Sequence, residues 1–137
     1  MKIYNNNPIL LEPIDYLDIS TIKNILISNT YLSNSKLILT ELLDHLNSKH
    51  SFNFKVMLNN KIIAIWFSLE CVTHTSLSYF YIDPSIRHTK LGLTVFKLGL
   101  SKCNPNKPLL LYSKDISKYK RNVTYIKDDL YVFKGFN

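Results

Sequence analysis

The sequence predicts an α/β fold, in which strands and helices belong to one domain. Two apolar runs flank Asn59-Asn60, which is typical of a β-hairpin because asparagine tolerates positive φ. Residues 37–46 place leucine and isoleucine at helical spacing. Residues 79–100 change from an apolar strand, through an Asp-Pro break and a short basic loop, into an apolar helix.

The N-terminal part predicts one strand followed by two helices. Residues 8–13 read as a short strand between two prolines, which indicates an edge position. A helix follows, with Asp18 or Ser20 as its N-cap, and Asn and Ser residues in 29–34 end it. The second helix runs to about Asn47 and has the clearest apolar face in the chain.

The rest of the chain predicts five strands, with a helix between the third and the fourth. Strands are expected at 52–58, 61–69 and 76–82, and the apolar run within 61–69 suits a central strand because it is apolar on both faces. A helix at 91–100 precedes two prolines and a short buried strand at 109–112. Residues 115–125 are expected to form a helix or an irregular segment, and 130–133 a terminal strand.

Composition points to a single globular domain over residues 1–137. Apolar residues make up 46% and charged residues 20%, and no apolar run reaches the roughly 18 residues of a membrane span. The N-terminus lacks the apolar block of a signal peptide. Cys71 and Cys103 lack metal-site spacing, so we expect reduced, buried thiols and a cytoplasmic protein. The Asn, Ile and Lys bias is typical of a low-GC genome, and a virus or phage is one interpretation.

Positive charge is concentrated in the C-terminal part. Through residue 86, 6 Lys face 7 acidic residues (net −1), whereas from Arg87 onward 11 Lys and Arg face 3 acidic residues (net +8). Such a basic half attracts nucleotide phosphates, nucleic acid or an acidic protein surface, and solvated surface lysines are the plain alternative. Residues 112–125 interleave lysine, arginine and tyrosine, which suits either a nucleic-acid contact or an ordinary exposed helix.

The basic loop carries a resemblance to a known family. Its six positions are Arg87, His88, Thr89, Lys90, Leu91 and Gly92. This order resembles the Arg/Gln-x-x-Gly-x-Gly/Ala motif of the GNAT acetyltransferase superfamily, which follows a strand and opens a helix. The first and last positions match, but Lys90 replaces the middle glycine. The order of predicted elements also resembles the GNAT fold over nearly the whole chain, which implies a mixed, mostly antiparallel sheet flanked by helices on both faces.

The resemblance implies acetyl-CoA as co-substrate. In GNAT proteins the loop amides hold the diphosphate, and the pantetheine arm pairs with the exposed backbone of the preceding strand. Carried over, residues Arg87 to Gly92 would hold the diphosphate, and Phe80, Tyr81 and Ile82 would contribute backbone. A side chain at Lys90 crowds a phosphate more than glycine does, although its ammonium can pair with that phosphate.

The family chemistry moves an acetyl group to an amine, which needs a base for the amine and an acid for the leaving thiolate. The resemblance makes Glu70 or His74 the candidate base and Tyr119 or Tyr125 the candidate acid. Each of these side chains is also consistent with an ordinary, non-catalytic surface residue. The family pattern after Asn122 and Tyr125 lacks its terminal Gly-Phe here.

Two function classes follow from these residues. The first is an acetyl-CoA-dependent N-acetyltransferase acting on a small-molecule or protein amine. The second is a catalytically inactive GNAT-like structural or interaction protein, for example a phage virion or host-binding component, and a basic nucleic-acid-binding module is a third reading. Metal binding is not expected, because His45 and His50 lack the zincin arrangement.

Overall fold

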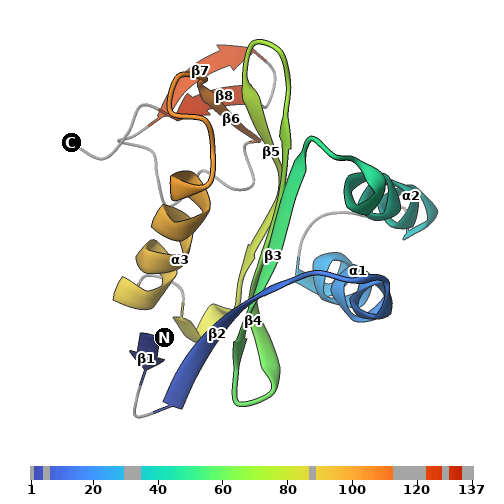
Figure 1. Ribbon diagram of the computed structural model, residues 1–137, viewed down its shortest axis with the longest axis vertical. Helices are drawn as coiled ribbons and strands as arrows, with labels where there is room; N and C mark the ends of the chain where they lie inside the picture. Colours follow the sequence, from blue (N-terminus) through green and yellow to red (C-terminus); the bar gives the residue numbers. More distant parts are fainter. Residues whose placement is uncertain are drawn as a thin grey trace.

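The computed structural model describes the backbone of residues 2–4, 7–29, 35–86, 89–112, 123–127 and 130–133. Eight strands form one sheet in the order β1-β2-β3-β4-β5-β6-β8-β7 (Figure 1). The strands are β1 (Lys2–Tyr4), β2 (Asn7–Pro13), β3 (Ser51–Leu58), β4 (Lys61–Glu70), β5 (Thr75–Ile82), β6 (Leu109–Tyr112), β7 (Val123–Lys127) and β8 (Leu130–Phe133). The α-helices are α1 (Ile19–Asn29), α2 (Ser35–Asn47) and α3 (Lys90–Ser101), and two 3-10 turns are η1 (Tyr16–Asp18) and η2 (Pro84–Ile86).

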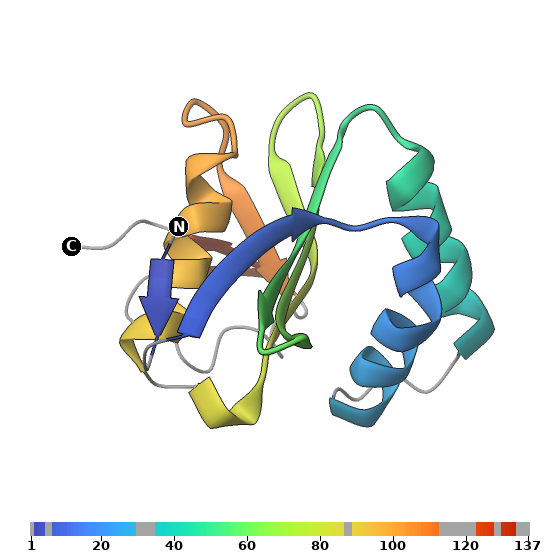
Figure 2. The same ribbon diagram turned by 60° about the horizontal axis from the view of Figure 1, so that its bottom comes forward.

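The sheet is mixed, as the sequence predicted. All neighbouring strands pair antiparallel except β5 and β6, which are parallel because α3 carries the chain from one to the other. Helices α1 and α2 cover one face of the sheet and α3 covers the other (Figures 1 and 2). The fold is therefore a layered α/β arrangement.

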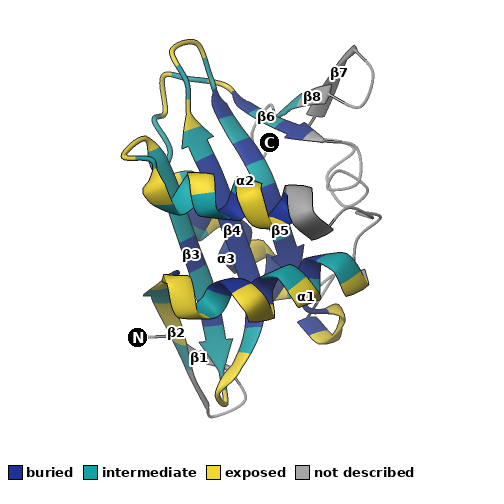
Figure 3. Ribbon diagram, turned by 90° about the vertical axis from the view of Figure 1, so that its right-hand side faces the viewer, coloured by how far each residue is buried: buried dark blue, intermediate teal, exposed yellow. Residues whose placement is uncertain are grey.

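Each face of the sheet has its own apolar core. On the α3 face, Trp66 and Phe96 are fully buried at the centre of one cluster. On the other face, Ile22 and Leu42 pack against Ile65. The buried residues of α1 and α2 lie toward the sheet and their exposed residues lie outward (Figure 3). Strand β4 sits between the two cores, which confirms its prediction as a central strand.

The hairpin between β3 and β4 turns at the predicted residues. Asn59 and Asn60 have φ of 52° and 62°. These are left-handed conformations, which asparagine adopts more readily than most other residues. The turn therefore fixes the pairing of Leu58 with Lys61.

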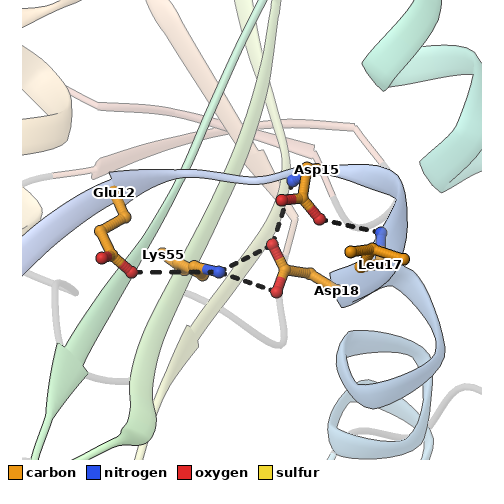
Figure 4. Close-up of polar contacts among 5 residues, drawn as sticks. All are labelled: Glu12, Asp15, Leu17, Asp18 and Lys55. Atoms are coloured by element: carbon orange, nitrogen blue, oxygen red, sulfur yellow. Dashed lines mark hydrogen bonds and ion pairs between the residues drawn. The ribbon is translucent and has the colours of Figure 1, made fainter.

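A charged contact fixes the start of α1. The Lys55 ammonium lies 2.7 Å and 2.8 Å from the two carboxylate oxygens of Asp18, and Glu12 lies 4.0 Å away (Figure 4). Asp18 also accepts from the Asp15 amide, while Asp15 accepts from the Leu17 amide. Burial raises the pKa of Asp18, but the Asp15 amide and Lys55 outweigh it and lower the pKa below its ordinary value. Asp18 therefore closes the turn before α1 and anchors it to β3.

Three sequence expectations need correction. Strand β2 is not an edge, because β1 pairs with it. Residues 123–125 belong to β7 rather than to a helix, and residues 113–122 lie outside the described part of the chain. Cys71 and Cys103 are free thiols but are half-buried rather than buried. No helix in the described residues has the length and apolarity that crossing a membrane requires.

Candidate active site

Strands β5 and β6 separate soon after they meet. They pair only at Thr75 with Leu109 and at Ser76 with Leu110, although β5 continues to Ile82. The remaining length of β5 therefore has no β6 partner in the register, and we call the side of β5 along residues 77–82, where β6 no longer pairs with it, the split. Parallel strands that diverge next to a helix start are a common place for ligands in α/β proteins.

The strand pairing shows which backbone groups face the split. The Asp83 amide donates to the Ile63 carbonyl at 2.8 Å, so that residue pairs with β4. Because backbone direction alternates along an antiparallel strand, Tyr81 also points toward β4, and Phe80 and Ile82 point toward the split. Phe80, Tyr81 and Ile82 were expected to offer backbone groups to the cofactor. The backbone groups of Phe80 and Ile82 point toward the split, whereas those of Tyr81 point toward β4.

Helix α3 begins at the open end of β5. Thr89 is its N-cap, with a hydroxyl that accepts from the Gly92 amide at 3.3 Å. The amides of Lys90 and Leu91 have no acceptor within the described residues, and the Lys90 side chain is exposed. Two amides and an ammonium thus gather at the positive end of the helix, which suits an anion. Arg87 and His88 lie outside the described residues.

Gly92 has a packing reason to be glycine. A Cβ at this position would lie 3.0 Å from the Ile86 carbonyl oxygen, and its own amide is capped by Thr89. The matching glycine of the motif therefore lets α3 pack against η2. The amides of this turn that have no acceptor within the described residues are those of Lys90 and Leu91.

Asp83 holds the turn between β5 and α3. Its carboxylate accepts from the Ser85 hydroxyl at 2.7 Å and the Ser85 amide at 2.9 Å, and Lys61 lies 3.1 Å away. Burial raises the pKa of Asp83, but the hydrogen bonds from Ser85 and the charge of Lys61 lower it to about 2. The ionised aspartate thus orients the segment that leads to α3.

A β-bulge lies in β5 near the point where the split begins. Phe67 pairs with Tyr79 and Ser68 pairs with Leu77, so Ser78 is an extra residue in β5. The Ser78 Oγ lies 2.9 Å from His45 Nε2, and the His45 Nδ1 lies 2.8 Å from the Glu41 carbonyl oxygen. The Ser78 hydroxyl, the His45 imidazole and the Glu41 carbonyl are therefore joined by two successive contacts beside the split.

Tyr79, next to the bulge, binds the same helix. Its hydroxyl donates to the Glu41 carboxylate, and burial together with that carboxylate raises its pKa far above the ordinary value. This phenol therefore stays protonated and fixes α2 against β5.

Glu70, the predicted base, lies at the closed end of the split. It pairs with Thr75 at the start of β5, and its Oε1 lies 3.3 Å from the Lys107 ammonium. A polar hollow of about 170 Å³ adjoins it, in which the buried Thr75 hydroxyl has no partner within the described residues. Burial, with a smaller effect of Glu70, raises the pKa of Cys103 beside this hollow to about 11, so the thiol stays protonated.

The other predicted residues are dispersed. His74 is on the β4–β5 hairpin, where its ring lies 3.0 Å from the Thr73 hydroxyl. Tyr125 belongs to β7, while Tyr119 and most of the lysine, arginine and tyrosine residues of 112–125 lie outside the described residues. The structure therefore does not bring Glu70 and His74 to the bulge. Among the described residues, no three metal-ligating side chains cluster.

The contact between Ser78 and His45 is not predicted by the sequence. The residues bind each other across 33 positions of sequence, and a β-bulge has no sequence pattern that marks it in advance. The available signal was weak: His45 is the last basic residue of an amphipathic helix that packs on the sheet.

Comparisons with solved structures show the fold. An acetyltransferase from Thermus thermophilus has a TM-score of 0.66 at 12% identity, covering 90% of this chain and 93% of its own. The ribosomal-protein-S18-alanine N-acetyltransferase of Escherichia coli has a TM-score of 0.66 at 11% identity, covering 91% and 90%. A GNAT family acetyltransferase from Brucella melitensis, solved with acetyl-CoA, has a TM-score of 0.62 at 13% identity, covering 92% and 87%.

These matches confirm the predicted GNAT-like fold along almost the whole chain. No protein-family model and no curated protein matches the sequence. None of the three structures comes from a virus or phage, so the viral interpretation has no support from them.

Proposed function

We propose that this protein is an acetyl-CoA-dependent N-acetyltransferase acting on a small-molecule or protein amine. The observation that carries the proposal is the split between β5 and β6, which opens beside the start of α3. There, the amides of Lys90 and Leu91 have no acceptor within the described residues. The GNAT-like fold of solved acetyltransferases supports the same reading.

The described residues suit acetyl-CoA in two places. The diphosphate would sit against the Lys90 and Leu91 amides and the Lys90 ammonium, with Arg87 to Gly92 as the surrounding loop. The pantetheine arm would lie in the split, where the backbone of Phe80 faces it. Because Lys90 is exposed and stands at the first helical position, its charge can compensate for the missing glycine.

Glu70 is the candidate base of the proposed reaction, and Tyr119 and Tyr125 are the candidate acids. The Glu70 carboxylate pairs with the Lys107 ammonium, and Glu70 lies at the closed end of the split, away from the bulge at Ser78. We retain Tyr119 and Tyr125 as candidates for the acid that protonates the leaving thiolate.

A specific observation favours the second function, a catalytically inactive GNAT-like structural or interaction protein. Lys90 stands in place of a glycine, and the Gly92 amide is capped internally by Thr89. The Lys90 side chain limits how closely a diphosphate can approach the backbone, and the Thr89 cap leaves the Gly92 amide unable to bind it. Such a protein would keep the fold and lack measurable affinity for acetyl-CoA.

Calorimetry with acetyl-CoA and with free CoA separates the two functions. The transferase predicts micromolar binding and a ligand-dependent rise in the melting temperature. Lys90→Ala should weaken binding by roughly tenfold or more, because a hydrogen bond to a charged group is lost. Lys97→Ala is the matched control, since Lys97 is an exposed lysine about two turns further along the same face of α3. Absence of binding by the wild-type protein would support the inactive reading.

A further inference from the structure

We propose that Ser78 and His45 form the proton-accepting pair of the transferase. Ser78 Oγ contacts the attacking amine, and His45 Nε2 receives the proton through that hydroxyl. The inference rests on the proposed function, and it replaces Glu70 and His74 as the base.

The hydrogen bonds of His45 fix which nitrogen is the acceptor. Nδ1 lies 2.8 Å from the backbone carbonyl of Glu41, and a carbonyl oxygen can only accept. In the neutral ring Nδ1 therefore carries the hydrogen, and Nε2 presents its lone pair to the Ser78 hydroxyl at 2.9 Å. This arrangement of hydroxyl, imidazole and orienting group is the one that activates a hydroxyl for proton transfer.

The bulge explains why Ser78 reaches His45. Neighbouring residues of a regular strand point to opposite faces, but the extra residue turns both Ser78 and Tyr79 toward α2. The rings of Phe67 and Tyr79 pack edgewise on the imidazole, with centroid distances of 5.7 Å and 6.3 Å. The imidazole is therefore held in one orientation.

The pair also lies where the chemistry needs it. Ser78 is two residues beyond Ser76, the last residue of β5 that pairs with β6. Both Ser78 and His45 are half-buried, and they lie on the face of the sheet opposite to α3. An amine that approaches from the α2 side would meet the Ser78 hydroxyl at the start of the split.

The other titratable groups around His45 do not compete for this role. Tyr79 donates its hydroxyl to Glu41, and its raised pKa keeps it protonated. The Glu41 carboxylate is thereby occupied on the same helix. Asp44, the remaining acidic residue of α2, is exposed on the outer side.

The proton transfer balances without any further reagent. A neutral amine attacks the thioester carbonyl, and the new C–N bond leaves an extra proton on nitrogen. That proton passes to the Ser78 hydroxyl while the hydroxyl proton moves to His45 Nε2. The C–S bond breaks, the thiolate takes a proton from the candidate acid, Tyr119 or Tyr125, and the imidazolium then returns its proton to that tyrosinate through solvent, which leaves the amide and free CoA thiol.

Release of CoA thiol from acetyl-CoA tests the pair without knowledge of the natural acceptor. Water and n-butylamine serve as probe nucleophiles. We expect His45→Gln and Ser78→Ala to lower kcat by roughly 100-fold, the scale of general base catalysis, with an unchanged KM for acetyl-CoA. His50→Gln and Ser76→Ala are matched controls and should keep the wild-type rate. Imidazole added to His45→Ala should restore activity, but not when added to Ser78→Ala.

The outcomes separate this inference from the proposed function. Variants that keep the wild-type kcat, or a loss that appears in KM alone, would overturn the proton-accepting role. Wild-type protein that binds acetyl-CoA but releases no thiol would overturn the role and leave cofactor binding intact. Absence of acetyl-CoA binding in calorimetry would overturn the proposed function itself. Thermal unfolding of each variant identifies any loss that comes from misfolding.

Discussion

At the scale of single residues, Gly99 fixes the distance between α3 and the sheet. A Cβ here would lie 2.3 Å from the ring of Trp66, which is fully buried. In an exposed helix, glycine to alanine stabilises by roughly 0.5–1 kcal/mol. Gly99→Ala should instead lower the free energy of unfolding by about 1–3 kcal/mol, because the rigid indole has no room to move. Urea denaturation measures the sign, and a stabilised variant would contradict the close packing.

Ionisation of Asp83 makes the free energy of unfolding depend on pH under acidic conditions. Its pKa is about 2 in the folded protein and 3.8 in the reference state, so the ionised form favours folding. The contribution, about 2 kcal/mol, is complete above pH ~4 and is lost as pH falls toward the folded pKa. Asp83→Asn should therefore be less stable than wild type at pH 6, and the difference should narrow below pH 4. Denaturant titrations measure the difference in the free energy of unfolding between wild type and Asp83→Asn. An equal difference at pH 6 and at pH 3 would argue against this account.

At the scale of elements, the start of α3 depends on one hydroxyl. Thr89 accepts from the Gly92 amide and donates to the Ile86 carbonyl, so it joins η2 to the helix. Thr89→Ala should cost about 1 kcal/mol, the usual effect of losing an N-cap, whereas Thr89→Ser keeps the oxygen and should cost much less. Equilibrium unfolding of the two variants provides the comparison. Similar losses in both would mean that the methyl group, not the hydroxyl, matters.

Local patterns predicted the elements better than their irregularities. The change of hydrophobic period located β5 and α3 within one or two residues, because each buries a regular face. The bulge at Ser78 and the early end of β5–β6 pairing arise from contacts between distant segments, so no local pattern marks them. The strand, loop and helix that form the proposed cofactor site could thus be predicted from sequence, whereas the contact between His45 and Ser78 could not.

At the scale of the whole molecule, the sequence predicted six strands and three α-helices in the order in which the structure has them. Strand β1 was missed because three residues carry too little periodicity, and it forms by pairing with β2. Strand β7 was missed because it directly follows the lysine- and arginine-rich residues 114–121, which resemble an exposed helix, while its pairing with β8 decides the outcome. Short outer strands depend on their neighbours rather than on their own sequence.

The position of β4 also governs how the molecule opens. Both of its edges are paired, with β3 and β5, and apolar cores cover both of its faces. Its amide hydrogens should therefore exchange with deuterium only through global unfolding, whereas those of β1 should exchange through local fraying. Hydrogen exchange followed by mass spectrometry can resolve the two segments. The molecule would then loosen from its outer strands inward, with the β4 ladder as the last part to reach solvent.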